Sequence, residues 1–465
     1  MTMTILEYLQ KEGRQINAVC AGHHKCGRCL VRLLNRTVNL TEHEKRILSS
    51  EKIERGFCLA CMHVYEEGDI IETEADEITV HDDAVMSEEG WRYRPGTGLA
   101  ADLGTTTVVM KWIDLETGKE IHGSAFMNPQ TSYGADVISR IAAYPETGKE
   151  MHDVLIRRME EEIIKAGINI TEMVLAGNTV MTHLFLQEDP SPMGVYPFRV
   201  PVPDLQKRNA EEIFPHTGMH FPIVTFPHIS AYVGGDITAG LYALDLDQTE
   251  EPVLFMDLGT NGELVYCGEK RIASSAAAGP AFEGSGIRCG GGSIPGAVSA
   301  VKLDPLRIET IGDQEPVCIC GSGIISLTAE LVRHGMLEST GQMKYGEADL
   351  GNGISFGPAD LANVQLAKAA VQAGVRILLK NRYAGRVYIA GGFGKGIDPA
   401  DLKTLHILPE HMTAESAGNT SMAGCIKLLM RQDMERVQAI ARETDSVELA
   451  AEEDFQKIWI ESLYF

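Results

Sequence analysis

The chain has 465 residues, of which 44% are hydrophobic and 23% are charged, a composition typical of globular proteins. Its formal net charge of −24 argues against sequence-independent binding to nucleic acid or to an anionic membrane, because both need a basic surface. No apolar run is long enough to span a bilayer, and the first residues, which include Glu7, do not resemble a signal peptide. We therefore expect a cytoplasmic protein, in which cysteines more often bind metal or lie buried than form disulfides.

The N-terminal region holds five of the ten cysteines. The order Cys20-x5-Cys26-x2-Cys29, followed by a distant cysteine, is close to the spacing of plant-type ferredoxins, in which three thiolates on one loop bind a 2Fe–2S cluster. The fourth ligand would then be Cys58 or Cys61. Cys26-x2-Cys29 and Cys58-x2-Cys61 also fit a structural zinc site, so the spacing leaves cluster and zinc as alternatives.

Three regions follow one another along the chain. Residues 1–80 are short and rich in cysteine, and the charged stretch 81–96 ends in Pro-Gly, which is typical of a linker. From residue 97 onward, β-rich and helical runs alternate, which predicts an α/β fold. The three- and four-residue spacing of apolar side chains predicts helices over 150–167 and 358–381.

The long region contains an internal repeat. GLAADLGTTTVVMKWIDLETGKEI (98–121) and VLFMDLGTNGELVYCGEKRIA (253–273) each contain an apolar strand, the turn Asp-Leu-Gly-Thr, a second strand and a polar turn. Asp102 and Asp257 occupy the same place in the two hairpins, 155 positions apart. That spacing is too long for a solenoid repeat but suits a duplicated domain.

Both hairpin turns carry groups that bind phosphate. Turns made of Gly and Thr expose backbone N–H groups and hydroxyls together, and such a nest binds phosphate oxygens. A carboxylate at the strand end can hold Mg²⁺ through water. A third element, IAGGFGKGID (389–398), is an apolar strand with a Gly-rich turn that would let the backbone approach a nucleoside closely. The phosphate candidates are Gly104, Thr105, Thr106, Thr107, Gly259, Thr260, Asn261 and Gly262, and the nucleoside candidates are Gly391, Gly392, Phe393 and Gly394.

Each motif alone is weak, and the chain has no GxxxxGK[ST] phosphate loop. The combination of two matching hairpins and a later Gly-rich turn resembles the acetate and sugar kinase, heat-shock chaperone and actin superfamily. Helices rich in small residues, expected in 232–244 and 417–429, fit the connecting motifs of that superfamily. The resemblance implies two ribonuclease H-like halves, residues 97–250 and 251–465, that close over ATP and Mg²⁺ with the two hairpin aspartates flanking the phosphates.

The N-terminal sequence resembles a second known domain. TILEYLQKEG, CAGHHKCGRCLVRL, LTEHEKRIL and GFCLACMHV are similar to the ferredoxin domain of the ATP-dependent reductive activators of corrinoid proteins, which join it to an ATPase of the class above. AGNTVMTHLFL, AAAGPAFEGSGI and CICGSGIISLTAEL are further stretches similar to this family. The family pattern implies Cys20, Cys26, Cys29 and Cys61 as cluster ligands and leaves Cys58 as an extra thiol. Because the chain starts at the helix TILEYL, a small, truncated β-grasp ferredoxin-like domain is expected.

The resemblance implies a function. The protein would deliver one electron from a 2Fe–2S cluster and use ATP to convert Co(II) of a corrinoid protein to Co(I) for a methyltransferase system. Asp102 and Asp257 would act at Mg²⁺, and an upstream electron donor would supply the electron. No nucleic acid or membrane partner is expected, and the oligomeric state is open, with a homodimer as one option. A carboxylate or sugar kinase with a zinc-binding N-terminal appendage, and a non-catalytic ATP-bound redox scaffold, are alternatives.

Overall fold

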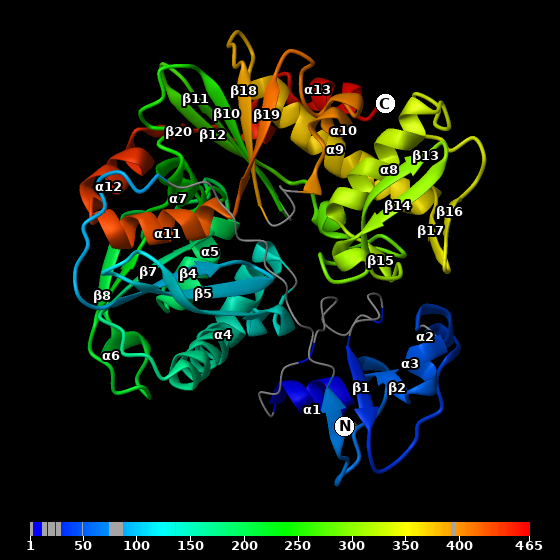
Figure 1. Cartoon of the computed structure of the whole chain (residues 1–465), viewed down its shortest axis with the longest axis horizontal. Helices are drawn as coiled ribbons and strands as arrows, with labels where there is room; N and C mark the ends of the chain where they lie inside the picture. Colours follow the sequence, from blue (N-terminus) through cyan, green and yellow to red (C-terminus); the bar gives the residue numbers. More distant parts are fainter. Residues whose placement is uncertain are drawn as a thin grey trace.

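The computed structural model describes residues 3–11, 16, 24, 29–48, 50–73, 87–134, 136–259, 261–391 and 396–465. Within these residues, a small N-terminal domain precedes a large domain that is built on two six-stranded sheets (Figure 1). No helix of the described residues is long and apolar enough to cross a bilayer.

The N-terminal domain is a three-stranded antiparallel sheet with short helices. Its elements are α1 (Ile5–Lys11), β1 (Leu30–Leu33), α2 (Glu42–Ile47), α3 (Ser50–Glu54), β2 (Phe57–Leu59), the 3₁₀ turn η1 (Ala60–Met62) and β3 (Ile71–Thr73). β1 is the central strand and pairs with β2 and β3. Alternation along β1 turns Val31 and Leu33 toward Ile5 and Leu9 of α1, and these side chains form a small separate core.

The large domain contains one order of five strands twice, with a sixth strand added at opposite edges of the two sheets. Its strands are β4 (Thr97–Leu103), β5 (Thr107–Asp114), β6 (Glu120–Met127), β7 (Glu172–Gly177), β8 (Gln206–Asn209), β9 (Pro222–Thr225), β10 (Val253–Leu258), β11 (Gly262–Cys267), β12 (Arg271–Ala276), β18 (Arg386–Ala390), β19 (Thr413–Gly418) and β20 (Thr444–Ser446). The first sheet has the order β6-β5-β4-β7-β9-β8, and the second has the order β20-β12-β11-β10-β18-β19. β4 and β10 each pair antiparallel with the next strand in sequence and parallel with a later one. The duplication predicted from the two hairpins is therefore present in the fold.

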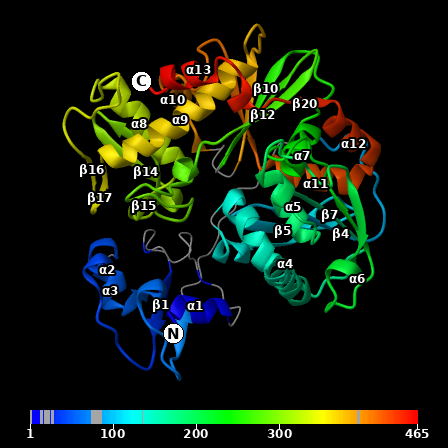
Figure 2. The ribbon, with the colours of Figure 1, turned by 180° about the vertical axis from the view of Figure 1, so that it is seen from behind.

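Helices cover the outer faces of the sheets and also fill the space between them (Figures 1 and 2). They are α4 (Val137–Ala166), α5 (Thr179–Phe185), α6 (Ala210–Ile213), α7 (Gly235–Ala243), α8 (Gly321–Arg333), α9 (Pro358–Leu378), α10 (Pro399–Thr404), α11 (Thr420–Arg431), α12 (Met434–Arg442) and α13 (Phe455–Glu461). α9 agrees with the helix predicted over 358–381. α4 starts well before the predicted residue 150 and continues through Pro145. The sequence pattern missed this first part because proline usually ends a helix.

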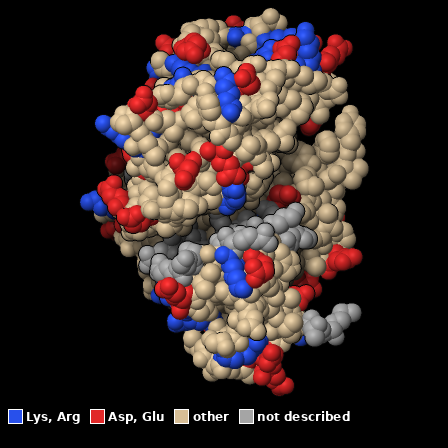
Figure 3. Space-filling view, turned by 90° about the vertical axis from the view of Figure 1, so that its right-hand side faces the viewer, with Lys and Arg blue, Asp and Glu red and all other residues tan. Residues whose placement is uncertain are grey.

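A smaller lobe interrupts the second half of the large domain. It consists of β13 (Ala297–Leu303), β14 (Leu306–Thr310) and β15 (Cys318–Ile319), followed by the hairpin β16 (Ala348–Gly351) and β17 (Ile354–Phe356). The N-terminal domain lies on the side of the molecule where α4 and this lobe are found, in both opposite views (Figures 1 and 2). On the face seen in Figure 3, acidic and basic side chains are interspersed, so the negative net charge is not gathered into one patch there.

Strand alternation gives each large sheet two different faces. On β4, Leu99 packs with α4 and α5, whereas Ala100 packs with α7 and α11. On β10, Leu254 packs with α8 and α9, whereas Phe255 packs with α7 and α11. α7, α11 and the two sheet faces around them therefore form one shared core, which we call the inner layer.

Glycines let α7 and α11 cross closely inside the inner layer. A Cβ atom on Gly424 would lie 2.4 Å from the carbonyl oxygen of Ala239 on α7. A Cβ atom on Gly240 would lie 2.7 Å from the Phe255 ring and 2.8 Å from the Thr420 hydroxyl. Because both sheets pack on this pair of helices, the crossing joins the two halves of the domain.

The end of the predicted linker is attached to the large domain. The backbone N–H of Arg92 donates to the carbonyl of Met430 on α11 (2.8 Å), and the Arg94 guanidinium bonds to Glu172 on β7 and to the carbonyl of Leu429 (2.7 Å). A Cβ atom on Gly118 would lie 2.2 Å from the Trp91 ring, so this indole sits tightly on the β5–β6 turn. Residues 87–96 are thus held by both the first sheet and α11.

The close helix crossing predicts that alanine destabilises the protein at Gly424 but not at a glycine that has open space around it. Gly424→Ala should lower the free energy of unfolding by about 2 kcal/mol, because overpacking against the fixed Ala239 backbone outweighs the helix propensity that alanine adds. Gly292→Ala is the matched control, since its added Cβ would meet no atom within 4 Å. Urea unfolding followed by tryptophan fluorescence measures both. A Gly424→Ala protein as stable as the wild type would contradict the close crossing.

Candidate active site and cysteine site

The two predicted aspartates meet in the inner layer. Asp102 and Asp257 are each the last residue but one of their strands, β4 and β10. Each lies two positions after a residue that faces α7 and α11, Ala100 and Phe255, so alternation points both carboxylates into the same layer. The negative charge of Asp102 acts on Asp257, which places the two groups near each other although they are far apart in sequence.

Two further carboxylates belong to this site, and sequence reasoning did not single them out. Asp236 lies in the first turn of α7, where it accepts a hydrogen bond from the N–H of Ile237 (2.9 Å). Glu263 stands directly opposite Asp257 in the β10–β11 register. The Gly-Gly-Asp sequence at the start of the expected helix over 232–244 was the available signal for Asp236. Glu263 had none, because only strand pairing places it.

Burial, together with the charge of neighbouring carboxylates, raises the pKa of three of these acidic side chains. Burial, and then the charge of Asp102, raise the pKa of Asp236 to about 7. Burial raises the pKa of Asp257 to about 7 as well, with smaller contributions from Asp236, Asp102 and Glu283. The pKa of Glu263 is raised well above its ordinary range, first by burial. Titrating groups near neutrality are typical of catalytic sites.

Asp102 is held from the other half of the domain. The side-chain amide of Asn419 donates to one carboxylate oxygen (2.9 Å), and the hydroxyl of Ser421 donates to the other (2.8 Å). Both residues lie at the start of α11, where Asn419 also caps the helix by accepting from the N–H of Met422 (2.9 Å). The orientation of Asp102 is therefore set by the C-terminal half of the chain.

The first hairpin turn has the expected form. The N–H of Gly104 donates to the carbonyl of Thr107 (3.0 Å), which closes a tight turn around Thr105 and Thr106. Asn178, the N-cap of α5, donates from its side-chain amide to the Thr105 hydroxyl (2.8 Å). The three threonines are partly exposed, as residues of a phosphate site would be.

The second turn lies next to the nucleoside candidates and is one residue shorter than the first. The N–H of Gly259 donates to the carbonyl of Asn261 (2.8 Å), and Gly262 begins β11. Gly391 directly follows β18 with a φ of +102°, and a Cβ there would lie 2.8 Å from a carboxylate oxygen of Asp257. Only glycine fits so close to that carboxylate. The predicted site residues Thr260, Gly392, Phe393 and Gly394 lie outside the described residues.

In the N-terminal domain, Cys29 and Cys61 are brought together by the pairing of β1 and β2. Cys29 immediately precedes β1, Cys61 lies in η1, and the N–H of Ala60 donates to the carbonyl of Cys29 (2.8 Å). Both cysteines are almost fully buried, at 1% and 4% exposure. The Sγ of Cys61 lies 3.9 Å from the Nδ1 of His24. Cys20 and Cys26 lie outside the described residues.

Cys58 has a different setting from Cys61. It stands opposite Val31 within the β1–β2 ladder, whereas Cys61 lies after the ladder in η1. Burial, and then the charge of Glu44, raise the pKa of its thiol to about 12, which disfavours the thiolate that metal binding needs.

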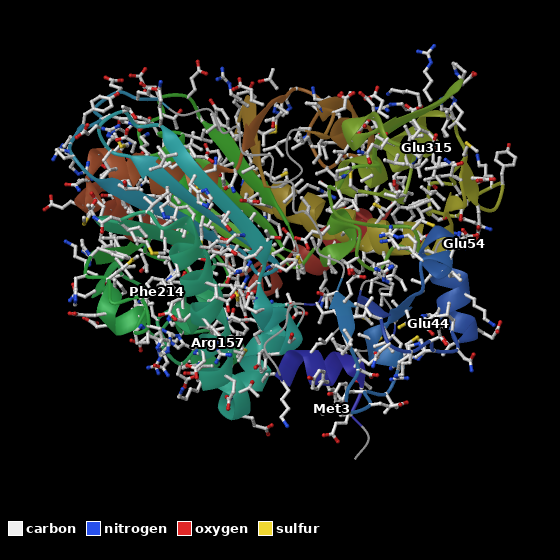
Figure 4. The ribbon with its side chains drawn as sticks, turned by 60° about the horizontal axis from the view of Figure 1, so that its bottom comes forward. Met3, Glu44, Glu54, Arg157, Phe214 and Glu315 are labelled. Carbon is white, nitrogen blue, oxygen red and sulfur yellow. The ribbon has the colours of Figure 1, made fainter. Side chains whose placement is uncertain are left out.

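A buried carboxylate braces the strand that leads to Cys61. Glu44 (labelled in Figure 4) has no exposed surface and accepts hydrogen bonds from the N–H of Leu59 (2.8 Å) and from the N–H of Thr41 (2.8 Å). The Nε2 of His63 lies 2.8 Å from the same carboxylate. Despite burial, these donors lower the pKa of Glu44. The residues on both sides of Cys61 are thus fixed to α2.

Comparison with protein families covers most of the chain. Residues 251–465 match the family model described as the C-terminal domain of RACo, the ASKHA domain, and residues 97–249 match the RACo middle region. Residues 2–66 match the 2Fe-2S iron-sulfur cluster binding domain. The fold and these matches define the class of protein: a 2Fe–2S domain joined to an actin-like ATPase domain of the acetate and sugar kinase, heat-shock chaperone and actin superfamily.

Individual relatives narrow this class. The chain is 31% identical to the corrinoid activation enzyme RamQ of Eubacterium limosum over 441 residues, covering 82% of this chain and 72% of the relative. It is 27% identical over 411 residues to the [Co(II) methylated amine-specific corrinoid protein] reductase of Methanosarcina barkeri, covering 78% and 76%. The solved structure of a reductive activator for corrinoid,iron-sulfur protein superposes with a TM-score of 0.72 at 27% identity, covering 100% of this chain and 95% of that one. The chain belongs to the RACo family of corrinoid activators.

The raised pKa values predict how stability depends on pH. Between pH 4 and 7 the folded state holds protons on Asp236 and Asp257 that the unfolded chain, with an ordinary pKa of 3.8, has released. The free energy of unfolding therefore falls as pH rises through this window. Asp257→Asn should reduce the loss between pH 5 and 8 by on the order of 2 kcal/mol.

Urea unfolding at the two pH values, followed by tryptophan fluorescence, measures this change. All three tryptophans lie in the large domain, so the signal reports on it. Asp445→Asn, at an exposed position on β20, is the control and should change the difference little. An Asp257→Asn protein with the pH dependence of the wild type would show that Asp257 ionises freely.

Proposed function

We propose that this chain carries out ATP-dependent reductive activation of a corrinoid protein, in which one electron converts Co(II) to Co(I). The observation that carries the proposal is the presence in one chain of the paired cysteines Cys29 and Cys61 and of the coupled carboxylates between two ATPase halves. The relatives named for corrinoid activation and for corrinoid protein reduction support it.

The N-terminal domain would hold the electron carrier. Cys20, Cys26, Cys29 and Cys61 would bind the 2Fe–2S cluster, which when bound supplies a one-electron centre near about −400 mV in plant-type ferredoxins. The described part of this set is consistent with that role, since backbone pairing places Cys29 beside Ala60, the residue before Cys61, and both thiols are buried. The hydrogen bonds of Glu44 keep the segment around Cys61 in place. An upstream electron donor would recharge the centre.

The large domain would bind ATP with Mg²⁺. Among the described residues no three His, Cys, Asp or Glu side chains converge to hold a metal ion by themselves. Mg²⁺ keeps several waters and takes its remaining ligands from one or two carboxylates and from phosphates. Asp102 and Asp257 would hold it through water. The turns at Thr105–Thr107 and Gly259–Gly262 would bind phosphates, and the loop from Gly391 to Gly394 would lie against the nucleoside.

The different settings of the aspartates suggest different roles. Asp102 is oriented by two neutral donors, which suits a group that positions Mg²⁺ and its waters. Burial raises the pKa of Asp236 to about 7, which suits transfer of a proton from the attacking water at neutral pH. Glu263 and Asp257 lie opposite each other and cannot both ionise readily.

ATP would act by changing the relation between the two halves. Reduction of Co(II) is uphill from a ferredoxin-like centre, so ATP has to supply the difference. Closure of the halves about the α7–α11 crossing can do this only if the open and closed states differ in affinity for the corrinoid protein. We place this activity in the cytoplasm and assign the corrinoid protein to a methyltransferase system.

The cysteine site predicts a contrast between two neighbouring thiols. Cys61→Ala should abolish the visible absorption of the anaerobically reconstituted protein and lower its iron content well below about two per chain. Cys58→Ala should keep both, because Cys58 lies in the strand ladder with a raised pKa. If Cys58→Ala loses the visible bands and Cys61→Ala keeps them, Cys58 is the fourth ligand and Cys61 is the extra thiol.

The proposed function is tested by anaerobic reduction of a Co(II) corrinoid protein. The reconstituted full chain, with dithionite as electron source, should produce Co(I) absorbance only when MgATP is present. Asp257→Asn should slow this reaction by about 100-fold or more, as loss of a positioned electrostatic group typically does. Its visible spectrum should stay unchanged, because the substitution is in the other domain.

Asp445→Asn should retain the wild-type rate. Reduction that proceeds equally without ATP, or an Asp257→Asn protein with full activity, would contradict the proposal. A colourless protein that binds one zinc would instead favour a role without electron transfer.

A further inference from the structure

A fully buried arginine lies directly behind the first phosphate turn. Arg140, on the first turn of α4, has no exposed surface. Its Nη2 donates to the carbonyl of Thr105 (2.6 Å) and its Nε donates to the carbonyl of Gly134 (3.0 Å). Its Nη1 contacts the Sδ of Met181 on α5. The guanidinium therefore joins the turn to two helices of the first half.

This guanidinium has no carboxylate partner among the residues that the structure describes. All three of its contacts are neutral, and Asp136 contributes only a distant charge. Burial lowers the pKa of Arg140 to about 9. Burying a cation without a counter-charge is costly. The hydrogen bonds to the carbonyls of Gly134 and Thr105 offset only part of this cost, because both acceptors are neutral.

The surroundings point to an anion that arrives from outside. Thr105 is held from two sides, its hydroxyl by Asn178 and its carbonyl by Arg140, so the turn is fixed before a ligand binds. The carboxylates Asp102 and Asp257 lie in the inner layer, whereas Arg140 lies among the residues on the outer face of β4. The positive charge of Arg140 thus lies on one side of the turn, and the carboxylates of Asp102 and Asp257 lie on the other side.

We propose that Arg140 is the positioning residue for the polyphosphate of the nucleotide: it fixes the Thr105 turn and provides the buried positive charge that the phosphates complete. This rests on the proposed function, since it takes the hairpin turn as the phosphate site. The charge acts through the turn, because the buried guanidinium does not reach the surface. Arg140, a residue that does not contact the ligand, then contributes to the preference for ATP over adenosine.

The experiment compares binding of ATP, ADP and adenosine by isothermal titration calorimetry to the full chain. Arg140→Met should weaken ATP binding by about tenfold or more and ADP binding less, because a buried charge interaction is lost. Adenosine affinity should change by less than about twofold, since adenosine carries no phosphate. Arg157→Met is the matched control, with the same substitution at an exposed position of the same helix (labelled in Figure 4).

Arg140→Lys keeps the charge but loses the planar fork, so its ATP affinity should fall by only about threefold, and its adenosine affinity should be unchanged. This variant decides the question if Arg140→Met does not fold, as judged by circular dichroism. Equal weakening of ATP and adenosine in the folded variants would show a merely structural role and overturn the proposal. Unchanged ATP affinity in Arg140→Met would also overturn it. A wild-type protein that binds none of the three ligands would instead contradict the ATPase function itself.

Discussion

Burial of acidic side chains in the inner layer is the constraint on which the candidate active site depends. Asp102, Asp236, Asp257 and Glu263 come from three strands and one helix, and burial is the main cause that raises the pKa of Asp236, Asp257 and Glu263, with smaller contributions from neighbouring carboxylates. Such burial costs stability, because it disfavours the charged form of each carboxylate. Arg140 lies on the other side of the first turn from Asp102.

The helices of the inner layer connect this chemistry to the movement of the whole domain. α11 belongs to the C-terminal half, yet its first residues hold Asp102 of the N-terminal half. α7 carries Asp236 and crosses α11 at glycines, so little space is available for independent shifts of the two helices. A change in the charge state around Asp102 is therefore felt directly at the junction of the halves.

Local patterns in the sequence predicted the parts of the site that lie in one stretch of chain. The two Asp-Leu-Gly-Thr hairpins, the glycine at position 391 and the helices α7 and α11 all follow from apolar runs and turn residues. Glu263, Ser421 and Arg140 could not be found this way, because strand register and helix packing place them. The first part of α4 was missed because the proline within it argues for a helix end. The four cysteine ligands remain predictions, and Cys20 and Cys26 lie outside the described residues.

The attachment of residues 87–96 to the large domain limits the distance by which the N-terminal domain can be separated from it. Thirteen residues separate the end of β3 at Thr73 from Ser87. A chain of that length spans at most about 45 Å. Because the two domains belong to one chain, their effective concentration is high, which favours encounters within one molecule over encounters between molecules. Arg92 and Arg94 are bonded to α11, so the connection reaches the large domain at the junction between its two halves.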